Sequence, residues 1–200
     1  MDINAMYKIG YGLYLLSAAS GGKDNACIVN TLGQVTVSPN RVSLTVNKLN
    51  LTHEMIAESG LFNVSVLSES APFSVYERFG YHSGRDTDKL SGDEPRSENG
   101  LIYFKENANA LISGRVVNAL DLGTHTMFIA DVTDCLVLSG EKSVTYDYYQ
   151  SNVKPKPEKP KKTGWRCRIC GYIYEGEQLP SDFICPICKH GAADFEKISV

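Results

Sequence analysis

The fold of the C-terminal part of the chain is decided by residues 167–188, which read CRICGYIYEGEQLPSDFICPIC. Two Cys-x2-Cys pairs are separated by 14 residues, so each pair can place two thiolates on one tight turn. Two such turns form a tetrahedral cage of four sulfurs, which suits zinc or iron. Because residues 164–200 are too few for a large apolar core, a metal is the expected staple of this segment. Two disulfides are the alternative.

The residues that flank the cysteines indicate what surrounds the metal. Gly171 follows the first pair and can take a positive φ that turns backbone N–H groups toward sulfur. An aromatic cluster around the site is expected from Trp165, Tyr172, Phe183 and Phe195. Hydrogen bonds to sulfur and a partly dry shell tune the reduction potential of an iron–thiolate site. The spacing alone leaves a zinc ribbon and a single-iron site open.

At these residues the segment resembles the rubredoxins. It begins with W-x-C-x-x-C-G-Y-x-Y and ends with P-x-D-F-x-C-P-x-C, and both patterns match that family. The resemblance implies one iron that cycles between Fe³⁺ and Fe²⁺, bound by Cys167, Cys170, Cys185 and Cys188. Two features depart from the family. The interval between the pairs is shorter than in free-standing rubredoxins, as in rubredoxin-like modules fused to other redox proteins, and Lys189 stands where a glycine is common.

A proline- and lysine-rich stretch divides the chain. Residues 151–163 read SNVKPKPEKPKKT and hold three of the eight prolines and five lysines, which predicts a semi-rigid linker of about 40 Å. The expected domains are therefore residues 1–150 and 164–200. Residues 1–150 carry a formal charge of −6, the linker +4 and residues 164–200 −1, which gives −3 for the chain of 200 residues. A docking strip for an acidic partner is the alternative reading of the linker.

Most of the first 150 residues are expected to form an antiparallel sheet. Alternation of apolar and polar residues predicts strands over 41–46, 62–66, 112–117, 126–132 and 134–138. Several short strands with one buried face are typical of a closed barrel, so the fold class is mainly β. Two helices are predicted, one capped by Thr52 and ending before Gly60, and one capped by Ser70 and ending at Gly80. The long polar stretch 81–100 is expected to be a functional loop.

Composition excludes several classes of protein. No apolar run approaches the ~20 residues of a membrane helix, and the nearly neutral charge argues against a nucleic-acid-binding chain. Residues 9–19 are apolar and are read as a first β-strand, with a signal peptide as the alternative. Neither G-x-G-x-x-G nor G-x-x-x-x-G-K-[ST] occurs, so a Rossmann site and a P-loop are not indicated.

An anion site is plausible where the segment 47–53 leads from a strand into the first helix. Lys48, neighbouring amide and hydroxyl side chains and the free N–H groups of a helix start would suit a phosphate. The alternative is a capped helix with an exposed lysine. The loop over residues 83–89 offers a second turn of small residues with Arg and Lys.

In order along the chain, these segments resemble the flavin reductase family of FMN-binding split β-barrels. The matching pieces are residues 24–31, 34–36, 47–53, 73–79, 83–89 and 123–129. The resemblance implies that Asn30, Thr31, Gln34 and Val35 line the flavin ring, that Asn47, Lys48, Asn50, Thr52 and His53 hold the ribityl phosphate, and that Ser83, Gly84, Arg85, Asp86 and Lys89 close over it. It places His125 near the nicotinamide and the flavin as the catalytic residue, and it implies a homodimer. Cys27 is expected to be a small apolar packing residue, and Cys135 is expected to be a core residue.

A flavin reductase barrel joined to a rubredoxin resembles the high-molecular-weight rubredoxins. The resemblance implies a cytoplasmic NAD(P)H oxidoreductase that passes electrons through FMN to iron and on to a flavodiiron protein, which reduces NO or O₂. A flavin takes hydride from NAD(P)H and releases single electrons, whereas an iron–thiolate site accepts one electron only. Three alternatives remain open: a reductase that releases free reduced flavin, a flavin-binding electron carrier without nicotinamide activity, and a barrel with a zinc ribbon that binds protein or nucleic acid.

Overall fold

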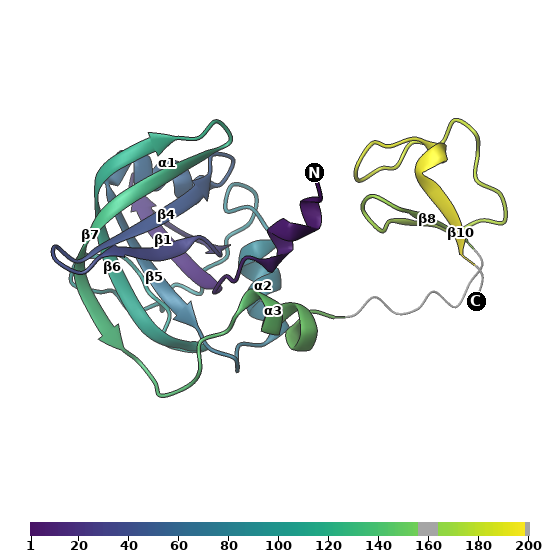
Figure 1. The fold of residues 1–200 in the computed structure, drawn as a ribbon. Coiled ribbons are helices and arrows are strands. Elements are labelled where there is room, and N and C mark those ends of the chain that lie inside the picture. Colours follow the sequence, from purple (N-terminus) through teal and green to yellow (C-terminus); the bar gives the residue numbers. More distant parts are fainter. Residues whose placement is uncertain (156–163, 199–200) are drawn as a thin grey trace. The chain divides into compact units, whose positions relative to one another are not determined.

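The chain forms two compact units, residues 1–154 and 155–200, in the computed structural model, which describes residues 1–155 and 164–198 (Figure 1). The larger part of the predicted linker, residues 156–163, lies outside the described residues. Ser151 to Val153, which the composition assigns to the linker, belong to a helical turn of the first unit, and Val153 packs against its core. No helix of the described residues is long and apolar enough to cross a membrane.

The first unit is a single antiparallel sheet with short helices. Its elements are η1 (Ile3–Lys8), β1 (Tyr14–Ser20), β2 (Lys23–Val29), β3 (Leu32–Thr36), β4 (Arg41–Asn47), α1 (Leu51–Ser59), β5 (Leu61–Leu67), α2 (Phe73–Gly80), β6 (Ala108–Asp121), β7 (His125–Val137), α3 (Tyr146–Tyr148) and η2 (Tyr149–Val153). The strand order is β2-β1-β5-β6-β7-β4-β3, and every neighbouring pair is antiparallel. The sheet curls on itself, and the prediction of a mainly β architecture is confirmed (Figure 1).

The long strands β6 and β7 lie in the middle of the strand order and join the two halves of the sheet. The sequence pattern predicts two strands over 126–132 and 134–138, but β7 is continuous, and this prediction is wrong in that respect. The register shift between Ser113 and Gly114 leaves Thr133 as an extra residue in β7, and the shift between Val116 and Asn118 leaves Val117 as an extra residue in β6. Because bulges bend a strand and increase its twist, β7 can pair with β4 over its first half and with β6 over most of its length.

Two apolar cores lie on opposite faces of β1. Leu16 belongs to the barrel core with Phe62 and Phe128, whereas Leu15 belongs to a second core with Tyr76 and Phe79 of α2. Successive side chains of a strand point to opposite faces, so a strand buried on both sides has a continuous apolar sequence. The expected first strand within residues 9–19 is confirmed as β1.

Both predicted helix caps are wrong, although both helices exist. Asn50 is the N-cap residue of α1, and Thr52 lies inside the helix with its hydroxyl accepting a hydrogen bond from Asn25. Helix α2 begins after Pro72, and the Ser70 hydroxyl pairs instead with Glu141 and Ser68. The two hydroxyls do not cap the helices because they form hydrogen bonds with Asn25 and Glu141, which are distant in sequence. Helix α1 ends as predicted at a left-handed Gly60, with φ of 69°.

The second unit has a small sheet and a small core. Strands β8 (Gly164–Cys167), β9 (Ile173–Tyr174) and β10 (Phe195–Ile198) pair in the order β10-β8-β9, and a short helical turn η3 (Ala192–Asp194) precedes β10. The buried core consists of Cys167, Cys185 and Phe195. Trp165, Tyr172, Tyr174 and Phe183 pack against it, so the expected aromatic cluster is confirmed.

Candidate functional site

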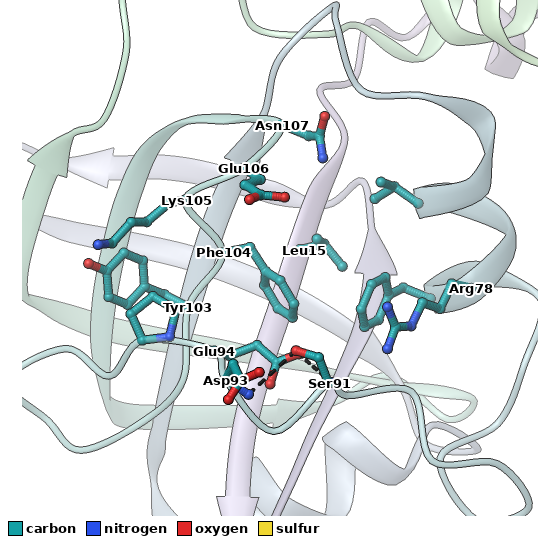
Figure 2. A pocket seen from close by; sticks show the side chains of 13 residues that line it. Leu15, Arg78, Ser91, Asp93, Glu94, Tyr103, Phe104, Lys105, Glu106 and Asn107 are labelled. Atoms are coloured by element: carbon teal, nitrogen blue, oxygen red, sulfur yellow. Dashed lines mark hydrogen bonds between the residues drawn. The ribbon is translucent and has the colours of Figure 1, made fainter.

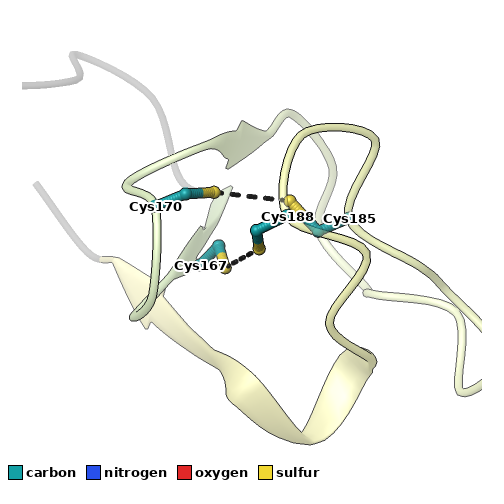
Figure 3. A group of neighbouring side chains, drawn as sticks. All are labelled: Cys167, Cys170, Cys185 and Cys188. Carbon is teal, nitrogen blue, oxygen red and sulfur yellow. Dashed lines mark hydrogen bonds between the residues drawn. The ribbon is translucent and has the colours of Figure 1, made fainter. Parts of the chain in front are cut away.

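The four predicted metal ligands lie together in the second unit. The Sγ atoms of Cys167, Cys170, Cys185 and Cys188 are all within 4.8 Å of one another (Figure 3). Sγ of Cys167 is 3.5 Å from that of Cys188, and Sγ of Cys170 is 3.5 Å from that of Cys185. Metal–sulfur bonds of about 2.3 Å place tetrahedral sulfurs roughly 3.8 Å apart. The cluster therefore fits one tetrahedral metal ion.

Each cysteine pair is held by a turn that ends in a left-handed residue. The Gly171 N–H donates to the Cys167 carbonyl at 2.9 Å, and the Lys189 N–H donates to the Cys185 carbonyl at 3.0 Å. Gly171 has a φ of 79° and Lys189 a φ of 63°. The expected positive φ at Gly171 is confirmed. Lys189 adopts the same conformation with a side chain, which L residues rarely do.

The turns aim backbone N–H groups at all four sulfurs, with Tyr172 donating to Cys170 and His190 to Cys188. Burial opposes ionisation of Cys185, but the N–H groups of Cys188 and Ile187 outweigh it and lower the pKa of this thiol to about 6. At Cys167 burial is likewise outweighed, by the N–H groups of Cys170 and Ile169, and the pKa is lowered. At Cys170 and Cys188 the backbone N–H groups are outweighed by burial and the neighbouring sulfurs, and the pKa is raised. Cys167 and Cys185 therefore ionise first, and thiolates rather than thiols coordinate metals.

The cage is dry on one side and open on the other. Cys167 and Cys185 are buried, whereas Cys170 is exposed and Cys188 is half-buried. A short path to solvent on one side is what electron transfer at a protein surface requires, and a dry shell on the other side tunes the potential.

In the first unit, a cavity of about 240 Å³ lies at the start of α1. Five of the predicted binding residues line it, namely Asn50, Thr52, Ser83, Gly84 and Lys89, together with Asn25, Cys27, Tyr81 and His82. Free N–H groups at a helix start favour an anion. The predicted anion-binding segment and the predicted loop therefore meet at one place.

Lys89 supplies the buried positive charge of this cavity. Lys89 is only 3% exposed, and its ammonium donates to the His82 carbonyl at 3.1 Å. Burial lowers the pKa of Lys89. An ammonium has three N–H groups, and the described residues provide one acceptor, so the cavity retains donors for an anionic ligand.

The shape of the cavity depends on a close contact between β2 and the loop. The Asn25 amide donates to the Thr52 hydroxyl at 2.8 Å, and both residues are buried. A Cβ at Gly84 would lie 2.0 Å from the Asn25 Oδ1, so only glycine allows this approach. Cys27 lies beside Asn50, whose amide is 3.8 Å from its sulfur, and burial raises the pKa of the thiol.

Four other predicted residues lie at the end of the β6–β7 hairpin. Asn47 pairs with His125 across β4 and β7, and His53 Nε2 is 2.8 Å from the Thr126 hydroxyl. Burial and the charge of Lys48 lower the pKa of His53. Lys48 forms a 2.7 Å ion pair with Asp121, so its charge is already matched.

The remaining predicted residues do not reach the small cavity. Asn30 lines a larger cavity of about 770 Å³ with Tyr146 and Gln150. Thr31 donates to the Thr45 carbonyl, Gln34 bonds Asn40, Val35 is 51% exposed, Arg85 pairs with Glu54, and Asp86 closes a backbone turn on Ser83. Among the cavity-lining residues, Asn25 and Tyr81 have no role in the sequence-based assignment. The one available signal is the polar Asn25 directly before the apolar run 26–29 of β2.

A further cavity of about 440 Å³ is lined by residues of β1, α2 and the segments 91–95 and 103–107 (Figure 2). Leu15, Phe79 and Phe104 line it, and Phe79 and Phe104 meet edge to face with centroids 5.1 Å apart. The rim is formed by charged residues, which include Arg78, Asp93 and Glu94. None of the predicted site residues lines this cavity.

Comparison with protein families matches both parts of the chain. Residues 6–156 match the flavin reductase like domain, and residues 165–196 match the rubredoxin-like domain of rubrerythrin. The chain is similar to the high molecular weight rubredoxin of Moorella thermoacetica, with 35% identity over 99% of this chain and 100% of that protein. It is also similar to the ferric-chelate reductase (NAD(P)H) of Archaeoglobus fulgidus, with 37% identity over 78% of this chain and 93% of the relative.

Solved structures agree with this comparison. The flavoredoxin from Methanosarcina acetivorans matches with a TM-score of 0.59 and 25% identity, covering 64% of this chain and 69% of that chain. The match supports the split-barrel arrangement of the first unit.

Proposed function

The chain belongs to the flavin reductase-like family, carries a rubredoxin-like domain and is an oxidoreductase, and from this we propose that it passes electrons from NAD(P)H through FMN to a single iron. The iron then reduces a separate redox protein, and the whole-chain likeness to a high molecular weight rubredoxin supports a flavodiiron protein as that acceptor. We assign the flavin role to residues 1–154 (the flavin domain), which include Ser151 to Val153 of the expected linker, and the iron role to residues 164–200 (the iron domain).

The observation that carries the proposal is the buried Lys89 ammonium, which lines a cavity at the start of α1. We assign the FMN phosphate to this cavity, where the free N–H groups of α1, the Thr52 hydroxyl and Lys89 can donate to it. Asn50, Ser83 and Gly84 border the same space. Lys48 is paired with Asp121 and Arg85 with Glu54. Both would therefore attract the phosphate electrostatically without contacting it.

The rest of the flavin site is assigned to residues outside this cavity. Asn30, Thr31, Gln34 and Val35 are proposed for the ring end, and Asn47, His53 and His125 for the nicotinamide side. Bound FMN would accept hydride from NAD(P)H and give up electrons singly. The chain's own contribution is to bind the phosphate, orient the ring and exclude water.

The four cysteines would hold iron in a one-electron site. Four thiolates at tetrahedral spacing fit iron and zinc equally, so the assignment of iron rests on the rubredoxin-like match of residues 165–196. Cytoplasmic location is proposed because NAD(P)H is supplied there and free thiols persist there.

A homodimer is proposed for the flavin domain. Exposed aliphatic side chains gather on the ends of β3 and β7: Val35, Val37, Leu136 and Val137 are 51%, 80%, 45% and 86% exposed. An apolar cavity of about 390 Å³ lined by Val42, Val132 and Cys135 opens near them. Light scattering should give twice the chain mass. A monomer would contradict this part of the proposal.

The decisive experiment is anaerobic stopped-flow absorption of the purified protein. Addition of NAD(P)H should bleach the flavin bands first and the iron–thiolate bands second. Flavin bleaching with iron that stays oxidised would refute the relay. A protein that contains zinc and lacks the visible iron–thiolate bands would refute the metal assignment.

A second candidate function is a reductase that delivers electrons to small acceptors. The ferric-chelate reductase relative covers the flavin domain, which favours this alternative. It predicts that a Cys170→Ser variant without iron keeps full NAD(P)H-dependent reduction of a ferric chelate or of added FMN. Under the proposed relay, that variant keeps flavin reduction and loses transfer to the protein acceptor.

A further inference from the structure

The cavity of about 440 Å³ in the flavin domain has no part in the proposed function (Figure 2). Its volume lies within the range of about 300–1,000 Å³ that is usual for small-molecule sites. Its apolar lining comes from Leu15, Val75, Phe79, Tyr103 and Phe104. Because Phe79 and Phe104 meet edge to face, the lining presents aromatic surface against which a planar ring can pack.

The wall of this cavity at Phe104 is fixed by buried polar side chains of the sheet. The Phe104 N–H donates to the Ser65 hydroxyl at 3.0 Å. The preceding Ile102 carbonyl accepts from the Ser17 hydroxyl at 2.6 Å and from the Asn63 amide at 3.1 Å. Ser17, Asn63 and Ser65 are all fully buried. A wall that is already ordered loses little conformational freedom when a ligand binds.

The rim of the cavity offers charges of both signs. It is formed by the cations Arg78 and Lys105 and by the acids Asp93, Glu94 and Glu106. None of the ion pairs among the described residues includes any of these five, whereas those of the flavin domain engage Arg41, Lys48, Arg85 and Arg96. In Figure 2, Arg78 and Lys105 lie on opposite sides, with Glu94 and Glu106 between them. Such a rim is complementary to a ligand that itself carries both charges.

Two of these charged groups are held in place at the cavity. The Arg78 guanidinium lies over the Phe79 ring, 5.4 Å from its centroid. The Glu94 carboxylate accepts from the Ser91 N–H at 2.7 Å and from the Gly92 N–H at 3.0 Å. A guanidinium can bind a carboxylate through two parallel hydrogen bonds, and carboxylates accept from an ammonium. Each sign of charge therefore has a fixed partner available for a ligand.

We propose that this cavity binds a small aromatic zwitterion, namely a free aromatic amino acid or a close analogue. The ring of the ligand packs on Phe79 and Phe104, and its carboxylate pairs with Arg78. Its ammonium pairs with Glu94 and Glu106. This ligand is distinct from FMN and from NAD(P)H, so the proposal goes beyond the proposed function and does not depend on it.

Phe79 separates this site from the cavity assigned to the FMN phosphate. It is the one residue that lines both cavities, and the Lys89 ammonium lies 5.9 Å from its ring centroid. A ligand that packs on Phe79 therefore contacts a side chain next to Lys89 without entering the phosphate cavity. Both ligands can be bound at the same time.

Calorimetric titration of the full-length protein with L-phenylalanine tests the site. We expect a Kd of about 1 mM or below. 2-Phenylethylamine lacks the carboxylate and 3-phenylpropanoate lacks the ammonium, so each should bind about tenfold more weakly than L-phenylalanine. Equal affinity for the three compounds would show that the charges are not recognised and would overturn the proposal. Absence of binding at about 10 mM L-phenylalanine would overturn it as well.

Variants at the rim assign the two charges. Arg78→Ala should weaken binding of L-phenylalanine about tenfold and leave that of 2-phenylethylamine unchanged. Glu106→Gln should weaken binding of L-phenylalanine and leave that of 3-phenylpropanoate unchanged. Glu77→Gln is the matched control, because Glu77 is exposed and adjacent to Arg78 on α2 but does not line the cavity. Wild-type affinity for L-phenylalanine in Arg78→Ala would contradict the assignment of the carboxylate.

Saturation with FMN separates this site from the proposed flavin site. The affinity for L-phenylalanine should stay within about twofold when FMN is bound, because the two ligands occupy different cavities. Displacement of L-phenylalanine by FMN would place the probe in the phosphate cavity and overturn the proposal. A chain that binds L-phenylalanine but does not pass electrons from NAD(P)H to iron would refute the proposed function and leave this site intact.

Discussion

The two units of this chain are stabilised in different ways. The flavin domain has two apolar cores built from side chains such as Phe62, Leu16 and Phe128, each at most 2% exposed. The iron domain has a buried core of Cys167, Cys185 and Phe195, so two of its three members are metal ligands. The flavin domain has apolar cores that do not depend on a ligand, whereas the buried core of the iron domain consists largely of metal ligands.

The cysteines illustrate the same difference. Cys27 is buried in the barrel core as a small apolar side chain, and burial raises the pKa of its thiol. Cys185 is equally buried, but backbone N–H groups lower its pKa to about 6. Burial therefore suppresses ionisation in one unit, and the turn geometry promotes it in the other.

Metal removal should have the largest effect, and only on the iron domain. Structural metal sites contribute about 10–16 kcal/mol of apparent binding free energy, far more than a core of three residues can supply. We expect Cys185→Ser or chelation under reducing conditions to collapse the NMR signals of residues 164–198 and to leave those of the barrel dispersed.

Cys135 is exposed, because this end of β7 extends beyond the part that pairs with β4, so the prediction that it is a core residue is wrong. It offers the matched control. Cys135→Ser should leave both sets of NMR signals unchanged. Dispersed signals of residues 164–198 without metal would show that the aromatic cluster is a sufficient core, and the contrast between the units would then be wrong.

A core truncation in the barrel should have the converse effect. Phe62 is fully buried, and its ring lies where a Cβ at Gly114 would come within 2.3 Å. Phe62→Ala should destabilise the flavin domain by about 3–5 kcal/mol, and the iron–thiolate absorption should persist after the barrel melts. Ile3→Ala, at a 69% exposed position, is the control and should cost little. Simultaneous loss of both signals would mean that the units fold as one.

Lys89→Met tests the charge buried in the flavin domain. Loss of the ammonium should weaken FMN binding by about 10–100-fold, since a hydrogen bond to a charged group contributes about 1.5–3 kcal/mol. Burial lowers the pKa of Lys89, so the charged form destabilises the ligand-free fold below that pKa, and the cost disappears as pH rises through it. The ligand-free variant should therefore melt higher than the wild type at neutral pH, with a smaller difference at alkaline pH.

Lys48→Ala is the matched comparison for Lys89→Met. Lys48 is ion-paired to Asp121 at the exposed end of the hairpin, so its removal should affect FMN affinity less. Fluorescence titration with FMN measures both variants. A larger loss at Lys48 would place the phosphate at the hairpin end instead.

The sequence predicts well what short-range patterns determine. The alternation over 41–46 and 62–66 lies within β4 and β5, and the two cysteine pairs form the expected turns. Each of these features depends on residues that are close in the chain, namely side-chain periodicity in a strand and thiol spacing on a turn.

The sequence predicts poorly what distant contacts determine. Lys48 and Lys89 both lie in polar segments next to helices, and only the fold makes one an exposed ion-pair partner and the other buried. Lys89 lines one cavity with Gly84 and Asn25, which approach each other closely although they are 59 positions apart. Thr52 is withdrawn from its predicted capping role by the same Asn25.

The smallest effect is expected for residues 91–94 of the flavin domain, a loop that is held by hydrogen bonds to Glu94. Burial alone would raise the pKa of Glu94, but hydrogen bonds from the N–H groups of Ser91 and Gly92 lower it below its ordinary value of 4.5. The stabilisation is present above pH 4.5 and is lost as pH falls below it. Glu94→Gln should loosen this loop by less than about 1 kcal/mol, because the group is largely solvated. Hydrogen exchange of the Ser91 and Gly92 amides should then become independent of this titration, while the exposed Glu98→Gln leaves it intact; unchanged titration in Glu94→Gln would assign the loop's order to apolar packing instead.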